Sequence, residues 1–351
     1  MSLRDDTDDK QNPVGLFQKV NAALNNLLKE TSRSVYLTLR VLPAGIRPQI
    51  GLAYLLARTT DTIADTEIVP LEQRFSALEF LRSRILEIHR KPADFGELAK
   101  HQGKPAERTL LERSEEALAT LDDLNSADQK RIRDVLTIII SGQELDLRRF
   151  AGASEKKIIA LQTDDELDDY TYRVAGCVGE FWTKMCCTYI FPRAALDDAK
   201  FLADGVRFGK GLQLVNILRD LPEDLRQGRC YLPAKELAAA GLTPEELLEP
   251  RNMERLRPVY QRYLARAEEH LKAGWTYTNT MPARCMRIRL GCSWLALLGI
   301  KTLAILRPAN VLEPGKRLKV SRREVRNVRW KTVLYYPWQP AWRRLFEASA
   351  G

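Results

Sequence analysis

Two segments of the chain carry pairs of aspartates that lie four residues apart. The first pair is Asp61 and Asp65, and the second is Asp220 and Asp224. On a helix, residues at this spacing share a face, so each pair would place two carboxylates side by side. Like charges repel each other there, and both pairs lie in apolar sequence. The spacing therefore favours a compensating cation at each pair.

Polar and basic side chains accompany both pairs on the same helix faces. Tyr54 and Arg58 precede Asp61 by seven and three residues. A single pair of this kind is typical of a solvated helix face. The doubled pattern with its companions is more specific, and around the second pair these companions are Gln213, Asn216 and Arg219.

The ligand types in these segments indicate a hard cation. The three histidines are scattered along the chain and the six cysteines form no CxxC motif, so neither zinc nor a disulfide framework is expected. Oxygen donors alone favour Mg²⁺, with Mn²⁺ as the alternative. Magnesium usually binds one or two carboxylates and completes its shell with water and substrate phosphates. We therefore expect a diphosphate substrate between the two acidic helices, with Arg58 and Arg219 on phosphate oxygens.

The surrounding sequence must fold into helices to position these groups. Apolar residues recur at helical spacing between Leu256 and Leu271, and strand-like alternation is scarce. No repeat is found, and nothing resembles a linker before residue 308. We expect an all-α protein with a polar segment over 1–20, a single large helical domain over 21–310, and a basic aromatic tail over 311–351. The stretch from Lys91 to Glu107, rich in proline and glycine, is expected to be a surface loop.

Pro222 interrupts the second acidic segment. It lacks the N–H that would bond the Leu218 carbonyl, which strains a helix at this point. Either the helix kinks at the metal site or it ends near Leu221. The metal contact of Asp224 is therefore less certain than that of Asp61.

The positive charge of the chain is concentrated near its end. The net charge is +9, and the stretch from Lys316 to Arg344 holds ten basic residues and one acid. The rest is neutral, which argues against nucleic-acid binding. Tryptophans and tyrosines interleave with the basic residues, as suits the surface of an anionic membrane. A solvated, loosely packed C-terminus is the alternative.

The sequence lacks the marks of secretion and of membrane insertion. The N-terminal segment is acidic and polar, unlike a secretory signal. The longest apolar run, Cys292 to Leu306, is short and contains Lys301. We expect a cytoplasmic protein without a transmembrane helix, peripheral at the inner face of the cytoplasmic membrane.

These motifs resemble the two aspartate signatures of the squalene/phytoene synthases. The resemblance rests on residues 61–65, on residues 216–224 and on the following 228–233 segment. Order and spacing agree with that family from about residue 25 to residue 310. Three further stretches match, namely Thr31–Ser34, Gly142–Asp146 and Tyr170–Gly179.

The resemblance implies a fold, a reaction and a set of roles. The fold would be the isoprenoid synthase fold, with a single helical domain around a central cavity. The reaction would be head-to-head coupling of two allylic diphosphates through a cyclopropylcarbinyl diphosphate. The four aspartates and Asn216 would hold Mg²⁺, and Tyr170 would help to remove a proton, although alone it could be a packing tyrosine. Substrate contacts would come from Ser32, Arg33, Tyr54, Arg58, Gln213, Arg219 and Arg229, and Val174 is a candidate for the wall of the prenyl-chain site or for simple core.

Members of this family differ in the second half of the reaction. Squalene synthases reduce the intermediate with NADPH, phytoene and dehydrosqualene synthases lose a proton, and some relatives stop at presqualene diphosphate. Lys319 and Arg322 loosely resemble the basic segment that holds the nicotinamide phosphate, whereas residues 229–233 are closer to the phytoene type. We expect a squalene synthase that acts on farnesyl diphosphate. The non-reducing enzymes and an inactive assembly factor with the same fold are the alternatives, and the last would be expected to have lost its aspartates.

Overall fold

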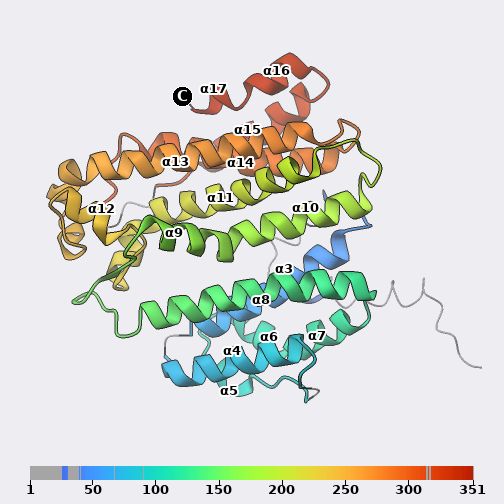
Figure 1. Ribbon diagram of the computed structural model, residues 1–351, viewed down its shortest axis with the longest axis horizontal. Coiled ribbons are helices and arrows are strands. Elements are labelled where there is room, and N and C mark those ends of the chain that lie inside the picture. The colour runs from blue at the N-terminus through green and yellow to red at the C-terminus, as the bar shows by residue number, and fades with distance from the viewer. Residues whose placement is uncertain are drawn as a thin grey trace, which may run out of the picture. The chain divides into compact units, whose positions relative to one another are not determined.

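The computed structural model describes residues 26–30, 39, 41–66, 68–89, 91–313, 315 and 318–350. Internal contacts divide the chain into two compact units. Unit 1 consists of Met1–Arg40 and Arg47–Arg133, and unit 2 consists of Val41–Ile46 and Asp134–Gly351. The boundary falls inside a single long helix, α8 (Ser126–Arg149) (Figure 1).

Unit 1 is built around the helix that carries the first acidic pair. This helix, α3, spans Arg47–Ala64, and α4, α6 and α7 contact it. Leu52, Leu55 and Ile63 on this helix are fully buried. Burial of this stripe fixes which face of α3 looks outward. Further helices of the unit include α4 (Leu71–Ile85), α5 (Gly96–Lys100), α6 (Pro105–Glu112) and α7 (Ser114–Asp122).

Unit 2 holds the second acidic pair in a layered set of long helices. Figure 1 shows α10, α11 and α13 running alongside one another. The elements before the second pair are β1 (Ile159–Ala160), α9 (Asp164–Thr171), the π-helix η1 (Tyr172–Gly176), α10 (Cys177–Tyr189) and α11 (Asp198–Arg226). Those after it are β2 (Arg229–Cys230), α12 (Ala234–Ala239), η2 (Glu245–Leu248), η3 (Pro250–Asn252), α13 (Met253–Thr280), α14 (Met286–Leu306), α15 (Arg322–Tyr335), α16 (Gln339–Arg344) and α17 (Glu347–Ala350).

Glycines let α11 approach its neighbours closely. A Cβ atom on Gly179 would lie 2.1 Å from the Gly205 carbonyl oxygen, and one on Gly209 would lie 2.2 Å from that of Ala175. Real Cβ atoms do not approach a backbone oxygen so closely, so larger residues would force the helices apart. The glycine-rich stretch of α11 is therefore a packing surface.

The fold class expected from the sequence is confirmed. Within the described residues the strands are two-residue segments, β1 and β2, which pair in parallel. The expectation of a surface loop between Lys91 and Glu107 is only partly correct, because α5 and the first residues of α6 lie within this stretch. Pro105 is tolerated at the start of α6, where its missing N–H has no helical partner to lose. The expected domain bounds stay a prediction.

The apolar helix α14 lies largely inside unit 2. Among the described residues it is the one helix long and apolar enough to cross a membrane by length and composition. Yet 61% of its most apolar stretch is buried, and α11 and α13 contact it. This is the behaviour of a core helix.

The C-terminal helices are partly integrated into the same core. Trp342 is fully buried, and its indole N–H donates to the Asn279 side chain at 2.7 Å. The rings of Trp275 and Phe346 stack in the same cluster. The described part of the tail is therefore not loosely packed, because half of its aromatic side chains belong to the core.

Candidate active site

The first acidic pair lies at the C-terminal end of α3. The Asp65 N–H donates to the Asp61 carbonyl at 2.8 Å, so the helical spacing continues one residue past Ala64. The Arg58 guanidinium lies 3.8 Å from the Asp61 carboxylate and donates to Glu107 at 2.6 Å. This face of the helix remains accessible, with Asp61 half-buried and Asp65 exposed. Tyr54, one turn before Arg58, is half-buried.

Threonines on the opposite side of α3 keep that side inside unit 1. Thr59 and Thr62 are buried, and their hydroxyls donate to the backbone carbonyls four residues earlier. Because these hydroxyls are satisfied within the helix, the threonines pack in the core without an unpaired polar group. The acidic side is left for ligands.

The second acidic pair lies near the C-terminal end of α11. The Arg219 guanidinium donates two hydrogen bonds to the Asp220 carboxylate, at 2.8 and 2.5 Å. Asp224 is more buried, and burial together with the Asp220 charge raises the pKa of its carboxyl to about 7. Asn216 is exposed on the same helix, and its amide donates to Gln213 at 3.5 Å.

The helix continues through Pro222 as far as Arg226. The alternative in which it ends near Leu221 is therefore wrong, and Asp224 remains four residues from Asp220 on one helix. The Leu218 carbonyl, which loses its helical donor at Pro222, accepts a hydrogen bond from the buried Tyr260 hydroxyl at 2.9 Å. The partner on α13 replaces the missing N–H and offsets the cost of the proline.

Arg229 follows α11 at the short parallel strand pair. Gly228 has a φ of +79°, which favours glycine, and its carbonyl accepts the Ile159 N–H at 2.8 Å. This turn brings Arg229 back toward the acidic pair, where its charge opposes the rise in the pKa of Asp224. Arg229 is thus a second basic group at this carboxylate.

Tyr170 is joined to the second pair by Tyr231, which the sequence did not single out, and by Asp146, which the sequence suggested as a helix-capping acid or an acid that supports the metal ligands. Its ring stacks on Tyr231 at a centroid distance of 4.6 Å, and the Tyr231 hydroxyl donates to Asp146 at 2.7 Å. Burial, with the neighbouring Tyr170 and Asp146, holds the pKa of Tyr231 well above its usual value. The Asp146 charge also contributes to the raised pKa of Asp224. Asp146 and Tyr231 lie in two of the stretches that match the family motifs, 142–146 and 228–233, and this match was the sequence signal that could have identified them.

Val174 lies in the π-helix η1, directly after Tyr170 and α9. A π-helical turn widens the backbone locally and is frequent at functional sites. The turn is held by Arg173, which donates to both Asp169 carboxylate oxygens at 2.9 Å and to the Ser141 hydroxyl at 2.7 Å. Val174 is half-buried, which suits either of the roles expected for it.

The remaining predicted residues are less informative. Ser32 and Arg33 lie outside the described residues. Lys319 and Arg322 are exposed, immediately before and at the start of α15. Within the described residues, no group of three or more acidic, histidine or cysteine side chains is arranged to hold a metal ion.

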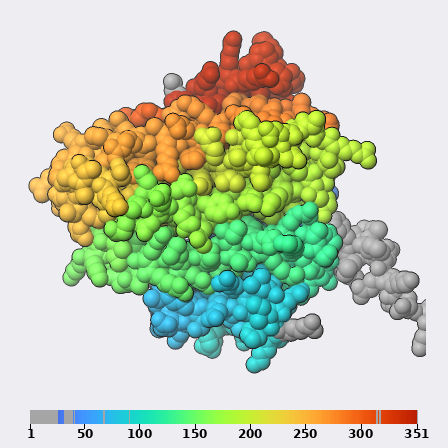
Figure 2. Space-filling model, viewed as in Figure 1, coloured from blue at the N-terminus to red at the C-terminus, as the bar shows by residue number. Residues whose placement is uncertain are grey.

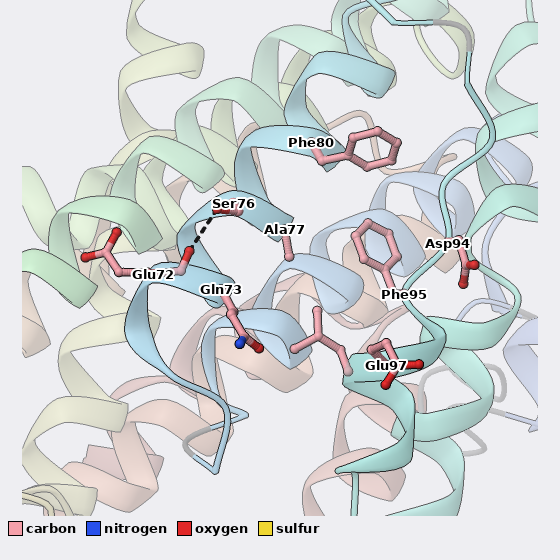
Figure 3. A pocket seen from close by; sticks show the side chains of 9 residues that line it. Glu72, Gln73, Ser76, Ala77, Phe80, Asp94, Phe95 and Glu97 are labelled. Atoms are coloured by element: carbon pink, nitrogen blue, oxygen red, sulfur yellow. Dashed lines mark hydrogen bonds between the residues drawn. The ribbon is translucent and has the colours of Figure 1, made fainter.

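A surface cavity in unit 1 is separate from these residues. It measures about 420 Å³ and lies between α4 and the start of α5, where Phe80 and Phe95 meet edge to face (Figure 3). None of the predicted site residues lines it. We assign it no role in the chemistry.

The acidic pairs fit the divalent cation expected for them. At the second pair, the proximity of Asp220 makes ionisation of Asp224 unfavourable, and a divalent cation would offset that repulsion. Arg219 and Arg58 provide part of this compensation as positive partners of the acids. The donor set is entirely oxygen, as Mg²⁺ prefers.

Comparisons with known proteins identify the family of the chain. The sequence model described as "Squalene/phytoene synthase" matches residues 28–324. A bifunctional lycopene cyclase/phytoene synthase from Colletotrichum graminicola is 31% identical over 250 residues, which cover 69% of this chain and 39% of that protein. The chain thus spans about two-fifths of the length of the curated relatives it matches.

Solved structures share the fold. TcSQS with a bound ligand matches at a TM-score of 0.75 and 18% identity, over 95% of this chain and 90% of that one. A squalene synthase from Alicyclobacillus acidocaldarius matches at a TM-score of 0.60 and 20% identity, over 85% and 98%. This isoprenoid synthase fold and the match over most of the sequence place the chain in the squalene/phytoene synthase family.

Proposed function

We propose that the protein couples two molecules of farnesyl diphosphate head to head, through presqualene diphosphate, and then reduces the product with NADPH to squalene. The observation that carries the coupling step is the second acidic pair, in which Arg219 pairs with Asp220 while the Tyr170, Tyr231 and Asp146 chain reaches Asp224 through the charge of Asp146. An acidic pair suits a metal-bound diphosphate, and the tyrosine chain suits removal of a proton.

The residues that would hold Mg²⁺ are oxygen donors on two helices. Asp220, Asp224 and Asn216 lie along α11, and Asp61 and Asp65 lie on and just after α3. When bound, the cation neutralises charge on the leaving diphosphate. When the cation occupies the carboxylates, the guanidinium groups of Arg219 and Arg58 can turn from Asp220 and Asp61 toward phosphate oxygens. Phosphate accepts the same paired N–H donors as a carboxylate does.

The tyrosine chain has a defined direction for a proton. Tyr231 carries one hydroxyl proton and donates it to Asp146 at 2.7 Å, so a proton that reaches Tyr231 can pass on to this carboxylate. Closure of the cyclopropane ring forms carbon–carbon bonds, expels one diphosphate and releases one proton. In the proposed step Tyr170 takes that proton while its own passes to Tyr231 and that of Tyr231 passes to Asp146.

The second half-reaction separates the proposal from its main alternative. Lys319 and Arg322 are exposed, and in this proposal they bind the phosphate of NADPH for hydride transfer to the rearranged cation. The matched sequence relatives are phytoene synthases, which favours a non-reducing enzyme that ends with proton loss. The two reactions give different products from the same intermediate.

Incubation with farnesyl diphosphate and Mg²⁺, with and without NADPH, tests the assignment. We expect presqualene diphosphate without NADPH and squalene with it. Lys319→Ala and Arg322→Ala should raise the KM for NADPH and leave the first coupling unchanged. A hydrocarbon with a central triene regardless of NADPH, from farnesyl or geranylgeranyl diphosphate, would replace this assignment by the phytoene type. Absence of any turnover would favour an assembly factor.

The expected products bear on location. Squalene and phytoene are hydrocarbons that dissolve in bilayers and not in water. We therefore infer a cytoplasmic protein that works at the inner face of the cytoplasmic membrane. The test is fractionation of intact cells with and without a high-salt wash, which should release the protein from membranes.

A further inference from the structure

The solvent-facing side of α15 carries an apolar stripe. Trp330, Val333 and Leu334 recur at helical spacing, and 74, 45 and 68% of their respective surfaces is exposed. The opposite side of the helix is already buried through Val328 and Thr332. Three large apolar side chains that a helix exposes together, while its other side is buried, indicate a surface for a partner, since large exposed apolar patches are uncommon.

The core holds α15 firmly. The Trp294 indole N–H on α14 donates to the Thr332 hydroxyl at 2.8 Å, and the Arg329 guanidinium lies 4.8 Å above the Trp294 ring. Just after α15, the Tyr336 hydroxyl donates to the Ala283 carbonyl at 2.5 Å. The exposed stripe is therefore presented by a fixed helix. The end of the chain projects from unit 2 at the red end of the colour scale (Figure 2).

A cavity of about 380 Å³ opens between α14 and α15, beside the stripe. Its lining combines two guanidinium groups with indole and aliphatic side chains. This combination suits an amphiphile with a phosphate headgroup and a hydrocarbon chain, because arginine binds phosphate and indole rings prefer the boundary between water and lipid. The lining residues are Leu290, Trp294, Arg326, Arg329, Trp330 and Val333.

Charge selects among the partners that could cover this face. Residues 322–344 include seven basic side chains and one acid, Glu324, which is engaged by the Ser321 cap. A second copy of the chain would bring two basic faces together, which is unfavourable. An anionic lipid surface complements the charge and also accepts the apolar stripe.

We propose that the outer face of α15, formed by Arg326, Trp330, Val333 and Leu334, docks the protein on the surface of an anionic phospholipid bilayer. Arg326 and Arg329 bind lipid phosphates, and the Trp330 indole lies among the headgroups. The stripe inserts shallowly beside them. This docking rests on the membrane location proposed above, for which it names the contact surface, and it does not depend on which hydrocarbon is made.

The test is binding of the full-length protein to phosphatidylglycerol-containing vesicles, with pure phosphatidylcholine vesicles as the comparison. Trp330→Ser/Leu334→Ser should weaken binding at least tenfold, and Arg326→Ser about fivefold with a smaller salt dependence. Point substitutions are preferable to truncation, because Trp342 and Phe346 beyond α15 are buried. Lipids carrying a quencher in the upper acyl chain should quench the wild type more than Trp330→Phe.

Matched controls exist on other exposed surfaces. Ile68→Ser/Ile88→Ser removes two comparably exposed apolar side chains from unit 1, and Arg251→Ser removes a highly exposed arginine from unit 2. Both should bind vesicles like the wild type, and coupling activity in detergent should be retained by every variant. Equal binding of wild type and Trp330→Ser/Leu334→Ser would overturn the proposal. A second result would also overturn it: the wild type fails to bind vesicles but self-associates, and Trp330→Ser/Leu334→Ser abolishes that self-association.

Discussion

At the second acidic pair the two carboxylates have different surroundings. Asp220 is neutralised by the two-point contact from Arg219, whereas burial raises the carboxyl pKa of Asp224 to about 7. A divalent ion would relieve the repulsion between the two acids. The pair is therefore better explained as a site for a bound cation than as two solvated acids on a helix surface.

Asp220→Asn, or Asp61→Asn at the first pair, should reduce turnover more than about a hundredfold, since the ion loses a charged ligand that offsets the diphosphate charge. Circular dichroism should show an intact fold. Glu254→Gln and Asp123→Asn, at exposed positions away from both pairs, are the controls. Near-normal rates at saturating Mg²⁺ in either site variant would remove the metal assignment.

Tyr231→Phe should slow cyclopropane formation by about 10- to 100-fold, because the ring packing on Tyr170 remains while the route for the proton to Asp146 is lost. Single-turnover measurement of presqualene diphosphate formation checks this. Tyr263→Phe removes a matched buried hydroxyl that donates to Asp164 at 2.7 Å. If both variants lose rate equally, the Tyr231 hydroxyl acts through stability alone.

At the scale of elements, α11 depends on α13 to remain helical through Pro222. The Tyr260 hydroxyl supplies the donor that the proline lacks at the Leu218 carbonyl. Without that donor, a buried carbonyl would be unsatisfied in the turn that joins the two acids. The geometry of the acidic pair is thus decided partly by a residue 36 positions beyond Asp224.

Tyr260→Phe should destabilise unit 2 by about 1–3 kcal/mol, the usual cost of leaving a buried acceptor unpaired. It should also raise the Mg²⁺ concentration needed for half-maximal activity. Pro222→Ala in the same chain restores the N–H and should recover much of both losses, as measured by urea unfolding and Mg²⁺ titration. Strictly additive effects in this double-mutant cycle would show that the two sites are not coupled.

At the scale of the whole molecule, the burial of His270 in unit 2 makes the free energy of unfolding depend on pH. It is half-buried on α13 against Gly211 of α11, and its Nδ1 has no hydrogen-bond partner among the described residues. Burial, with the charges of Arg207, Arg266 and Lys210, lowers its pKa to about 4, against the smaller opposing effect of Asp168. The folded state therefore keeps this imidazole neutral.

The stability contribution of His270 should be constant above about pH 6.5, where the unfolded imidazole loses its proton, and should fall as the pH decreases toward 4. The loss should be about 1–2 kcal/mol, reduced by partial exposure. The raised pKa of Asp224 makes its own contribution to stability grow as the pH falls, which opposes the effect of His270. The measurement therefore compares urea unfolding of wild type and His270→Gln at pH 7 and pH 4.5, because the Asp224 contribution is common to both proteins. Parallel pH profiles for the two proteins would refute this linkage.

Much of the fold and of the acidic site was predictable from local pattern. An apolar stripe at helical spacing marks α13, and the spacing of the second acidic pair predicts the helix face that it shares on α11. The interpretation of residues 91–107 as a loop was less accurate, because α5 and α6 are too short for periodicity to stand out. Tyr231 was given no role and Asp146 only that of a capping or supporting acid, since their contact joins residues 85 positions apart.

By itself the sequence determined the helical class, the two acidic pairs with their arginines, and the basic aromatic character of the chain end, because these follow from residue type and short-range spacing. Tertiary structure decided the rest. It buried Trp342 while exposing Trp330, it carried α11 through Pro222 by way of Tyr260, and it connected Tyr170 to Asp146 through Tyr231. These outcomes depend on which side chains meet across distant helices, and spacing along the chain does not encode that.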